Sequence, residues 1–93
     1  MNTLSDIQFE EDIMLDETGI TTCRLVIHND DINTFDWVID ALVEVCRHTR
    51  EQAEQCSYII HSRGKYAVKH GSFERLKPMK EAITERGINA TIE

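Results

Sequence analysis

Polar residues that suit recognition of an amino group follow one another at positions 28–31, His-Asn-Asp-Asp. The carboxylates of Asp30 and Asp31 accept hydrogen bonds, and the amide of Asn29 both donates and accepts them. Together they form a small polar cup that suits a protonated amine next to a peptide group. The same run is also typical of an ordinary turn in which an Asx side chain caps the following helix. The spacing alone leaves both interpretations open.

His61, directly after apolar Ile60, is a second candidate. A neutral imidazole can bond a ligand amine or carbonyl, although a histidine near a helix C-terminus is also favourable without any function. His28, Asp30 and His61 lack the spacing of a recognised metal site. Asp30 and Asp31 are adjacent, and nothing supplies the nucleophile or the enclosure that a hydrolase needs. We expect no catalysis, no metal and no cofactor, and we keep a small hydrolase or metal protein as an alternative.

Hydrophobic periodicity predicts the elements that must position these residues. Alternating apolar residues predict strands near 22–28, 65–69 and 88–92, and apolar stripes predict helices near 35–46, 49–61 and 73–86. The expected fold is α+β, a small three-stranded, largely antiparallel sheet with three helices on one face, in the order β-α-α-β-α-β.

Capping residues mark the ends of the expected helices. Asn33 or Thr34 can cap the first helix. A capping box, Thr49-Arg50-Glu51-Gln52, begins the second helix, Gly64 can end it, and Ser72 and Gly87 bracket the third. Pro78 removes a donor in the second turn of the third helix, so we expect an irregular start there.

Length and charge limit the function. The chain has 93 residues, which favours one domain, and a formal charge of −7. Six acidic residues and no Lys or Arg lie in residues 1–20, which leaves −1 for residues 21–93. We expect an acidic, mostly flexible N-terminal extension over 1–20 and a folded domain over 21–93. Nucleic acid is an unsuitable partner, because phosphate binding needs a basic face.

Localisation follows from what the sequence lacks. No apolar run approaches the roughly 20 residues of a membrane helix, and residues 1–20 show no signal-peptide pattern. The three cysteines show no close pairing such as CxxC, which favours a reduced, cytoplasmic protein.

Four segments in order resemble the ClpS adaptor family. They are residues 25–31 (LVIHNDD), 35–42 (FDWVIDAL), 60–65 (IHSRGK) and 88–93 (INATIE). Their spacing matches the family over residues 22–93 without a gap. The resemblance implies a non-catalytic adaptor that binds the free amino-terminal Leu, Phe, Tyr or Trp of an N-degron substrate. It also implies delivery to the N-terminal domain of a Clp-family AAA+ ATPase, ClpA- or ClpC-like, for proteolysis.

The resemblance also implies roles for individual residues. The α-amine and first peptide group of the substrate map onto Asn29, Asp30, Asp31 and His61. The side-chain pocket maps onto Asn33, Phe35, Val38, Ser57, Ile60 and Ile88. The ATPase-binding face maps onto Glu74, with Lys77 and Lys80 beside Met79, where the family has a Lys.

Three departures from the family pattern concern the substrate site. Phe35 replaces a family Met at the mouth of the pocket, and Ser57 replaces a second Met. Asn33-Thr34 also replaces the family Thr-Pro. We hypothesise that recognition survives while the preference among Leu, Phe, Tyr and Trp is shifted. The alternative is a generic protein-protein interaction domain, because the fold also resembles the C-terminal domain of the bacterial ribosomal stalk protein, and fold does not fix function.

Overall fold

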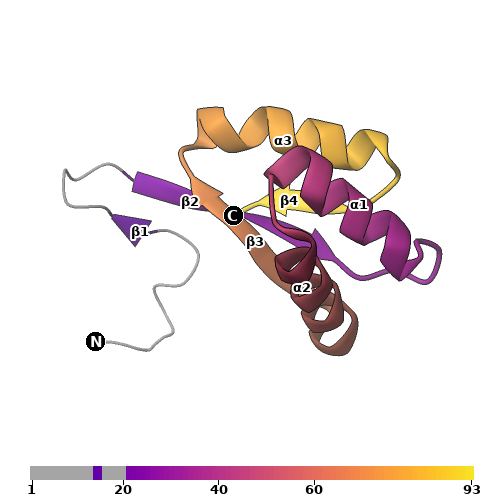
Figure 1. Cartoon of the computed structure of the whole chain (residues 1–93). Coiled ribbons are helices and arrows are strands. Elements are labelled where there is room, and N and C mark those ends of the chain that lie inside the picture. The colour runs from indigo at the N-terminus through magenta and orange to yellow at the C-terminus, as the bar shows by residue number, and fades with distance from the viewer. Residues whose placement is uncertain (1–13, 16–20) are drawn as a thin grey trace.

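A computed structural model describes residues 14–15 and 21–93, which form a sheet covered by helices (Figure 1). In chain order the elements are β1 (Met14–Leu15), β2 (Thr21–His28), α1 (Phe35–Cys46), α2 (Arg50–Arg63), β3 (Lys65–Gly71), α3 (Phe73–Glu85) and β4 (Ala90–Ile92). From β2 onward the order is β-α-α-β-α-β, which confirms the predicted fold. The remainder of the predicted N-terminal extension, residues 1–13 and 16–20, lies outside the described residues.

β2 is the central strand of the antiparallel sheet. It pairs with β3 from Cys23↔Gly71 to His28↔Lys65, with a bulge between Leu25 and Val26. On its other side it pairs with β4, Leu25↔Ile92 through Ile27↔Ala90. β1 pairs with the first residues of β2, an addition that the sequence patterns did not predict. The central position of β2 places the turn that follows it, residues 29–33, at the edge of the helical layer.

Side chains cap the three helices. Thr34 Oγ1 accepts a hydrogen bond from the Trp37 N–H at 3.1 Å, so Thr34, one of the two predicted candidates, caps α1. Thr49 and Gln52 form the predicted capping box of α2. Ser72 caps α3 as predicted.

The predicted end of α2 agrees with the structure, whereas the predicted effect of Pro78 on α3 does not. Gly64 ends α2 at φ +92°, a conformation that favours glycine. α3 passes through exposed Pro78 without a break, so the expected irregular start was wrong. Pro78 and Glu74, whose carbonyl loses its usual helical partner, are both exposed residues, so the missing bond lies away from the core.

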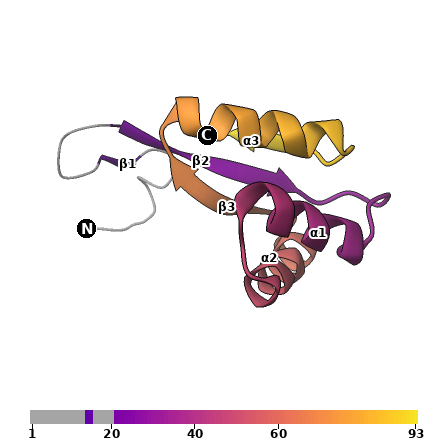
Figure 2. The same ribbon diagram turned by 45° about the horizontal axis from the view of Figure 1, so that its top comes forward.

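All three helices contribute to one core on one face of the sheet. α1 lies between α2 and α3; α2 packs on β3, and α3 packs on β2 and β4 (Figure 2). The core consists of Leu25, Ile27, Ile39, Ala41, Leu42, Cys46, Ala53, Ile60, Val68, Leu76, Ile83, Ile88 and Ala90. On the opposite face, Arg24 pairs with Glu93 at 3.3 Å, and His28 Nε2 bonds Thr91 Oγ1 at 2.9 Å.

The buried face of α2 includes one polar residue. Ala53, Ser57 and Ile60 are buried, whereas Cys56 and Ile59 are half-buried. α2 packs against both α1 and β3, so two neighbouring elements determine which of its residues are buried. Within the described residues, none of the helices combines the length and apolar character that crossing a membrane requires.

Candidate functional site

Asp30 organises the turn between β2 and α1. Its Oδ1 accepts hydrogen bonds from the backbone N–H groups of Ile32 and Asn33, both at 2.8 Å. Its Oδ2 accepts a third bond from Asn33 Nδ2 at 2.7 Å. These bonds, led by the Asn33 backbone N–H, hold the pKa of Asp30 below its ordinary value of 3.8. Asp30 therefore carries its charge at neutral pH, and it performs the Asx-turn role that the sequence suggested.

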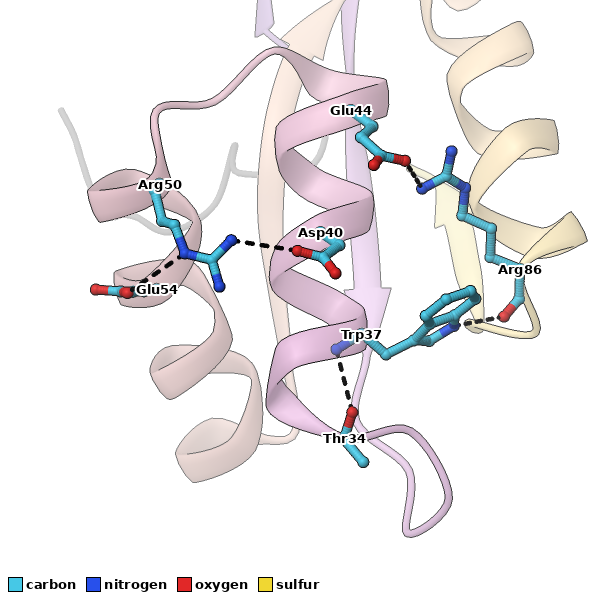
Figure 3. Close-up of polar contacts among 7 residues, drawn as sticks. All are labelled: Thr34, Trp37, Asp40, Glu44, Arg50, Glu54 and Arg86. Carbon is cyan, nitrogen blue, oxygen red and sulfur yellow. Dashed lines mark hydrogen bonds and ion pairs between the residues drawn. The ribbon is translucent and has the colours of Figure 1, made fainter.

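Asn33 links this turn to the far end of α3. The same Nδ2 that bonds Asp30 also donates to the Gly87 carbonyl at 3.0 Å, across 54 positions of sequence. Next to it, Trp37 Nε1 donates to the Arg86 carbonyl at 2.8 Å, and the Arg86 guanidinium pairs with Glu44 at 2.7 Å (Figure 3). The first half of α1 and the turn before it are thus attached to the α3–β4 connection.

A pocket of about 280 Å³ opens between this turn, the start of α1 and the end of α2. It is lined by Asn29, Asp30, Asp31, Asn33, Thr34, Phe35, Val38, Ser57, Ile60 and His61. A recess of about 20 Å³ adjoins it, lined by Ile88 and by Ile27, His28, Asn29, Asp30, Asn33, Val38 and Ile60. The structure therefore brings together all the residues expected to contact a substrate, with Ile88 in the recess.

The pocket is polar on one side and apolar on the other. The carboxylates of Asp30 and Asp31 and the imidazole of His61 are half-buried or exposed around it. Val38 and buried Ile60 provide apolar wall. Such an arrangement can hold a cationic group at its rim while an attached apolar group is removed from water.

Phe35 stands at the edge of the pocket with its ring packed on α2. Its ring centroid lies 5.4 Å from that of Tyr58 and 5.3 Å from that of His61, both in edge-to-face geometry. Such edge-to-face contacts favour these orientations of the Phe35 and His61 rings. Sequence reasoning missed Tyr58, although its three-residue spacing from His61 on α2 indicates a shared face. It also missed Thr34, which lines the pocket.

The histidine and carboxylate positions give no support to a metal site. His28 Nε2 is bonded to Thr91 Oγ1 on β4. Across residues 14–15 and 21–93, no group of three or more His, Cys, Asp or Glu side chains is arranged to hold a metal ion.

A larger hollow of about 580 Å³ lies on the other side of α2, against β3. It is lined by Arg47, His48, Gln52, Gln55, Cys56, Ile59, Tyr66, Ala67, Val68, Lys69 and His70. Two of its polar groups already have partners: His48 Nε2 bonds the Val68 carbonyl at 2.9 Å, and Lys69 Nζ bonds the Cys46 carbonyl at 3.0 Å. We place the candidate site in the smaller pocket, because charged groups and apolar wall converge there.

The residues expected to contact an ATPase lie along α3. Glu74 is exposed in its first turn, and Lys77 pairs with Glu81 at 3.0 Å. Lys80 is half-buried beside a hollow of about 210 Å³ that Phe73, Thr91 and Ile92 also line. Glu74 and the Arg86–Gly87 turn stand at opposite ends of this 13-residue helix, about 18 Å apart. This surface is therefore separate from the pocket.

Comparison with known proteins places these features in one family. The family model of the ATP-dependent Clp protease adaptor protein ClpS matches residues 20–91. A ClpS adapter protein of Nitratidesulfovibrio vulgaris (strain DP4) is 40% identical over 60 residues, which are 64% of this chain and 54% of the relative. A ClpS adapter protein of Oleidesulfovibrio alaskensis is 37% identical over 41 residues, 44% of this chain and 39% of the relative. The matches therefore span about half the length of these relatives or less.

A solved structure has the same fold. It is Agrobacterium tumefaciens ClpS2 bound to L-phenylalaninamide, with a TM-score of 0.65, 20% identity, and coverage of 75% of this chain and 92% of that one. The family model covers most of the chain, and the sequence relatives carry the same family name. The chain therefore belongs to the ClpS family of ATP-dependent Clp protease adaptor proteins.

Proposed function

We propose that this protein is a non-catalytic adaptor that binds the free α-amino group and the bulky apolar first residue of N-degron substrates. It delivers them to a Clp-family AAA+ ATPase. The observation that carries the proposal is the pocket of about 280 Å³ in which Asp30, Asp31 and His61 border an apolar wall. A peptide N-terminus combines these two chemistries, because its ammonium and its first side chain leave the same carbon atom.

Each half of the pocket contributes a separable part of the affinity. The α-ammonium gains charge-assisted hydrogen bonds to Asp30, whose lowered pKa keeps it ionised. Asn29 and His61 supply further polar contacts to the amine and the first peptide group. Burial of a large apolar side chain against Val38 and Ile60 contributes roughly 1.5–3 kcal/mol, about tenfold to a hundredfold in affinity.

The ligand of the structural neighbour supports this division. L-phenylalaninamide, which is bound to Agrobacterium tumefaciens ClpS2, carries an amino group, an amide and an aromatic side chain on one carbon. It has the groups that the two halves of the pocket suit. In this proposal Glu74, Lys77 and Lys80 contribute to a separate face that contacts the N-terminal domain of the ATPase.

The test is fluorescence anisotropy with labelled decapeptides that differ in residue one and in N-acetylation. Peptides that start with Leu, Phe, Tyr or Trp should bind, whereas those that start with Gly or acetyl-Leu should not. Asp30→Asn and His61→Ala should abolish binding. Asp40→Asn is the matched control, because Asp40 pairs with Arg50 on the outer side of α1, outside the pocket (Figure 3).

The same experiment separates the two functional classes. Equal affinity for free and acetylated peptides, or retention of binding in Asp30→Asn, would refute N-degron recognition. That result would favour the generic interaction domain of the same fold.

A further inference from the structure

Ser57 is an unusual residue in the pocket wall. Its exposed fraction is 3%, and among the described residues no other polar or charged residue is buried. Its Oγ has no hydrogen-bond partner within that part. Buried hydroxyls in folded proteins nearly always have one, so an exception needs an explanation.

The position of Ser57 on α2 relates it to the amine-binding rim. Ser57 and His61 are four residues apart and therefore share one face of the helix. Four residues correspond to a rise of about 6 Å. Ile60 and Val38 line the same pocket. The pocket thus offers polar groups at the rim, an apolar wall, and a polar group again about one helical turn away.

Among Leu, Phe, Tyr and Trp, only the side chains of Tyr and Trp carry a polar group, and tyrosine alone has it at the far tip of its ring. Tyrosine has an apolar ring and ends in a hydroxyl that both donates and accepts, as the serine hydroxyl does. Phenylalanine and leucine have no group that can bond Oγ. A serine side chain also reaches a new rotamer by rotation about a single bond, so its hydroxyl can turn toward a ligand.

Resting on the function proposed above, we propose that Ser57 makes this pocket selective for amino-terminal tyrosine over phenylalanine. The Ser57 hydroxyl and the tyrosine hydroxyl form a hydrogen bond inside the pocket. Ser57 Oγ, which has no partner among the described residues of the free protein, gains one when a peptide with an amino-terminal tyrosine binds. One such bond corresponds to a preference of about threefold to tenfold.

The experiment compares decapeptides that start with Tyr, Phe or Leu and are otherwise identical, bound to the full chain. The wild-type protein should bind the Tyr peptide about threefold to tenfold more tightly than the Phe peptide. In Ser57→Ala this ratio should fall to about one, with affinity for the Phe and Leu peptides retained. Ser62→Ala is the matched control, because Ser62 lies on the same helix, is exposed, and bonds the Ile59 carbonyl.

The outcomes separate this inference from the proposed function. If free Tyr and Phe peptides bind equally to the wild type while acetylated ones do not, the role of Ser57 is refuted and N-degron recognition stands. A Tyr preference that persists in Ser57→Ala also refutes it. If no free amino terminus binds, both proposals fail. Binding of the Leu peptide to Ser57→Ala shows that the variant is folded.

Discussion

The Asn33 side chain should stabilise both the fold and the binding site, and its contribution can be estimated from two hydrogen bonds. One joins Asn33 Nδ2 to Asp30 Oδ2 at 2.7 Å and the other joins it to the Gly87 carbonyl at 3.0 Å. The second is an ordinary bond worth about 1 kcal/mol. The first is charge-assisted, but the turn is solvated, so we count about 1 kcal/mol or less. Asn33→Ala should therefore lower the free energy of unfolding by about 1–2 kcal/mol.

A second variant, Trp37→Phe, measures what one hydrogen bond to the α3–β4 connection contributes to stability without touching the pocket. Trp37→Phe removes one bond to the neighbouring Arg86 carbonyl, 2.8 Å long, while Trp37 lies outside the pocket lining. It should cost about 1 kcal/mol, which lowers the melting temperature by roughly 4–8 °C in a domain of this size. Asn33→Ala should lower it by a similar or larger amount.

Only one of the two variants should affect binding. Asn33 holds the Asp30 carboxylate in place, so Asn33→Ala should weaken the Leu-peptide affinity by about threefold to tenfold. Trp37→Phe should leave it within twofold. Urea unfolding followed by circular dichroism measures the stability, and anisotropy measures the affinity. If Trp37→Phe weakens binding as much as Asn33→Ala, the position of the α3–β4 connection controls the pocket, and the reasoning about Asn33 is refuted.

Two further predictions concern ionisation. Because the pKa of Asp30 is lowered on folding, its contribution to stability is present above its unfolded value and is lost as pH falls through the lower native value. The difference in unfolding free energy between wild type and Asp30→Asn should therefore be constant from pH 7 to 5 and shrink below about pH 3.8. Urea midpoints measure this difference. A difference that persists unchanged at pH 2 contradicts the prediction. Burial raises the pKa of the Cys46 thiol to about 11, so iodoacetamide at pH 8 should modify half-buried Cys23 first and Cys46 only in urea, as followed by mass spectrometry. Equal rates for Cys23 and Cys46 in the native protein would contradict the buried position of Cys46.

Local signals predicted the elements well. Thr34, Thr49, Ser72 and Gly64 act through bonds or dihedral angles within a few residues, so the sequence carries the whole signal. The bounds predicted for α1, residues 35–46, agree with the structure. Pro78 is the exception, because a helix tolerates one lost bond when the residue is exposed and the opposite face is packed.

Contacts between distant elements account for what the sequence did not predict. The Asp30 cluster is contiguous, so its presence was evident, whereas the Asn33–Gly87 bond depends on how α3 meets α1. The packing of Phe35 on Tyr58 depends on how α1 meets α2. The pocket residues were expected from the family resemblance rather than from periodicity, and their roles in binding remain predictions.

The pairing of β2 with β4 has a consequence for the order in which the molecule assembles. β2 lies at the start of the predicted domain, yet one of the strands that pair with it is Ala90–Ile92, and Arg24 pairs with Glu93 across 69 positions. During synthesis, β2 can pair with β3 while β4 is still missing, so its other edge stays open until almost the whole domain has been made. Such long-range closure is slow, and an open edge in the interim invites pairing with other chains. We therefore expect the edge of β2 to be most open to pairing with other chains in the interval before β4 is made.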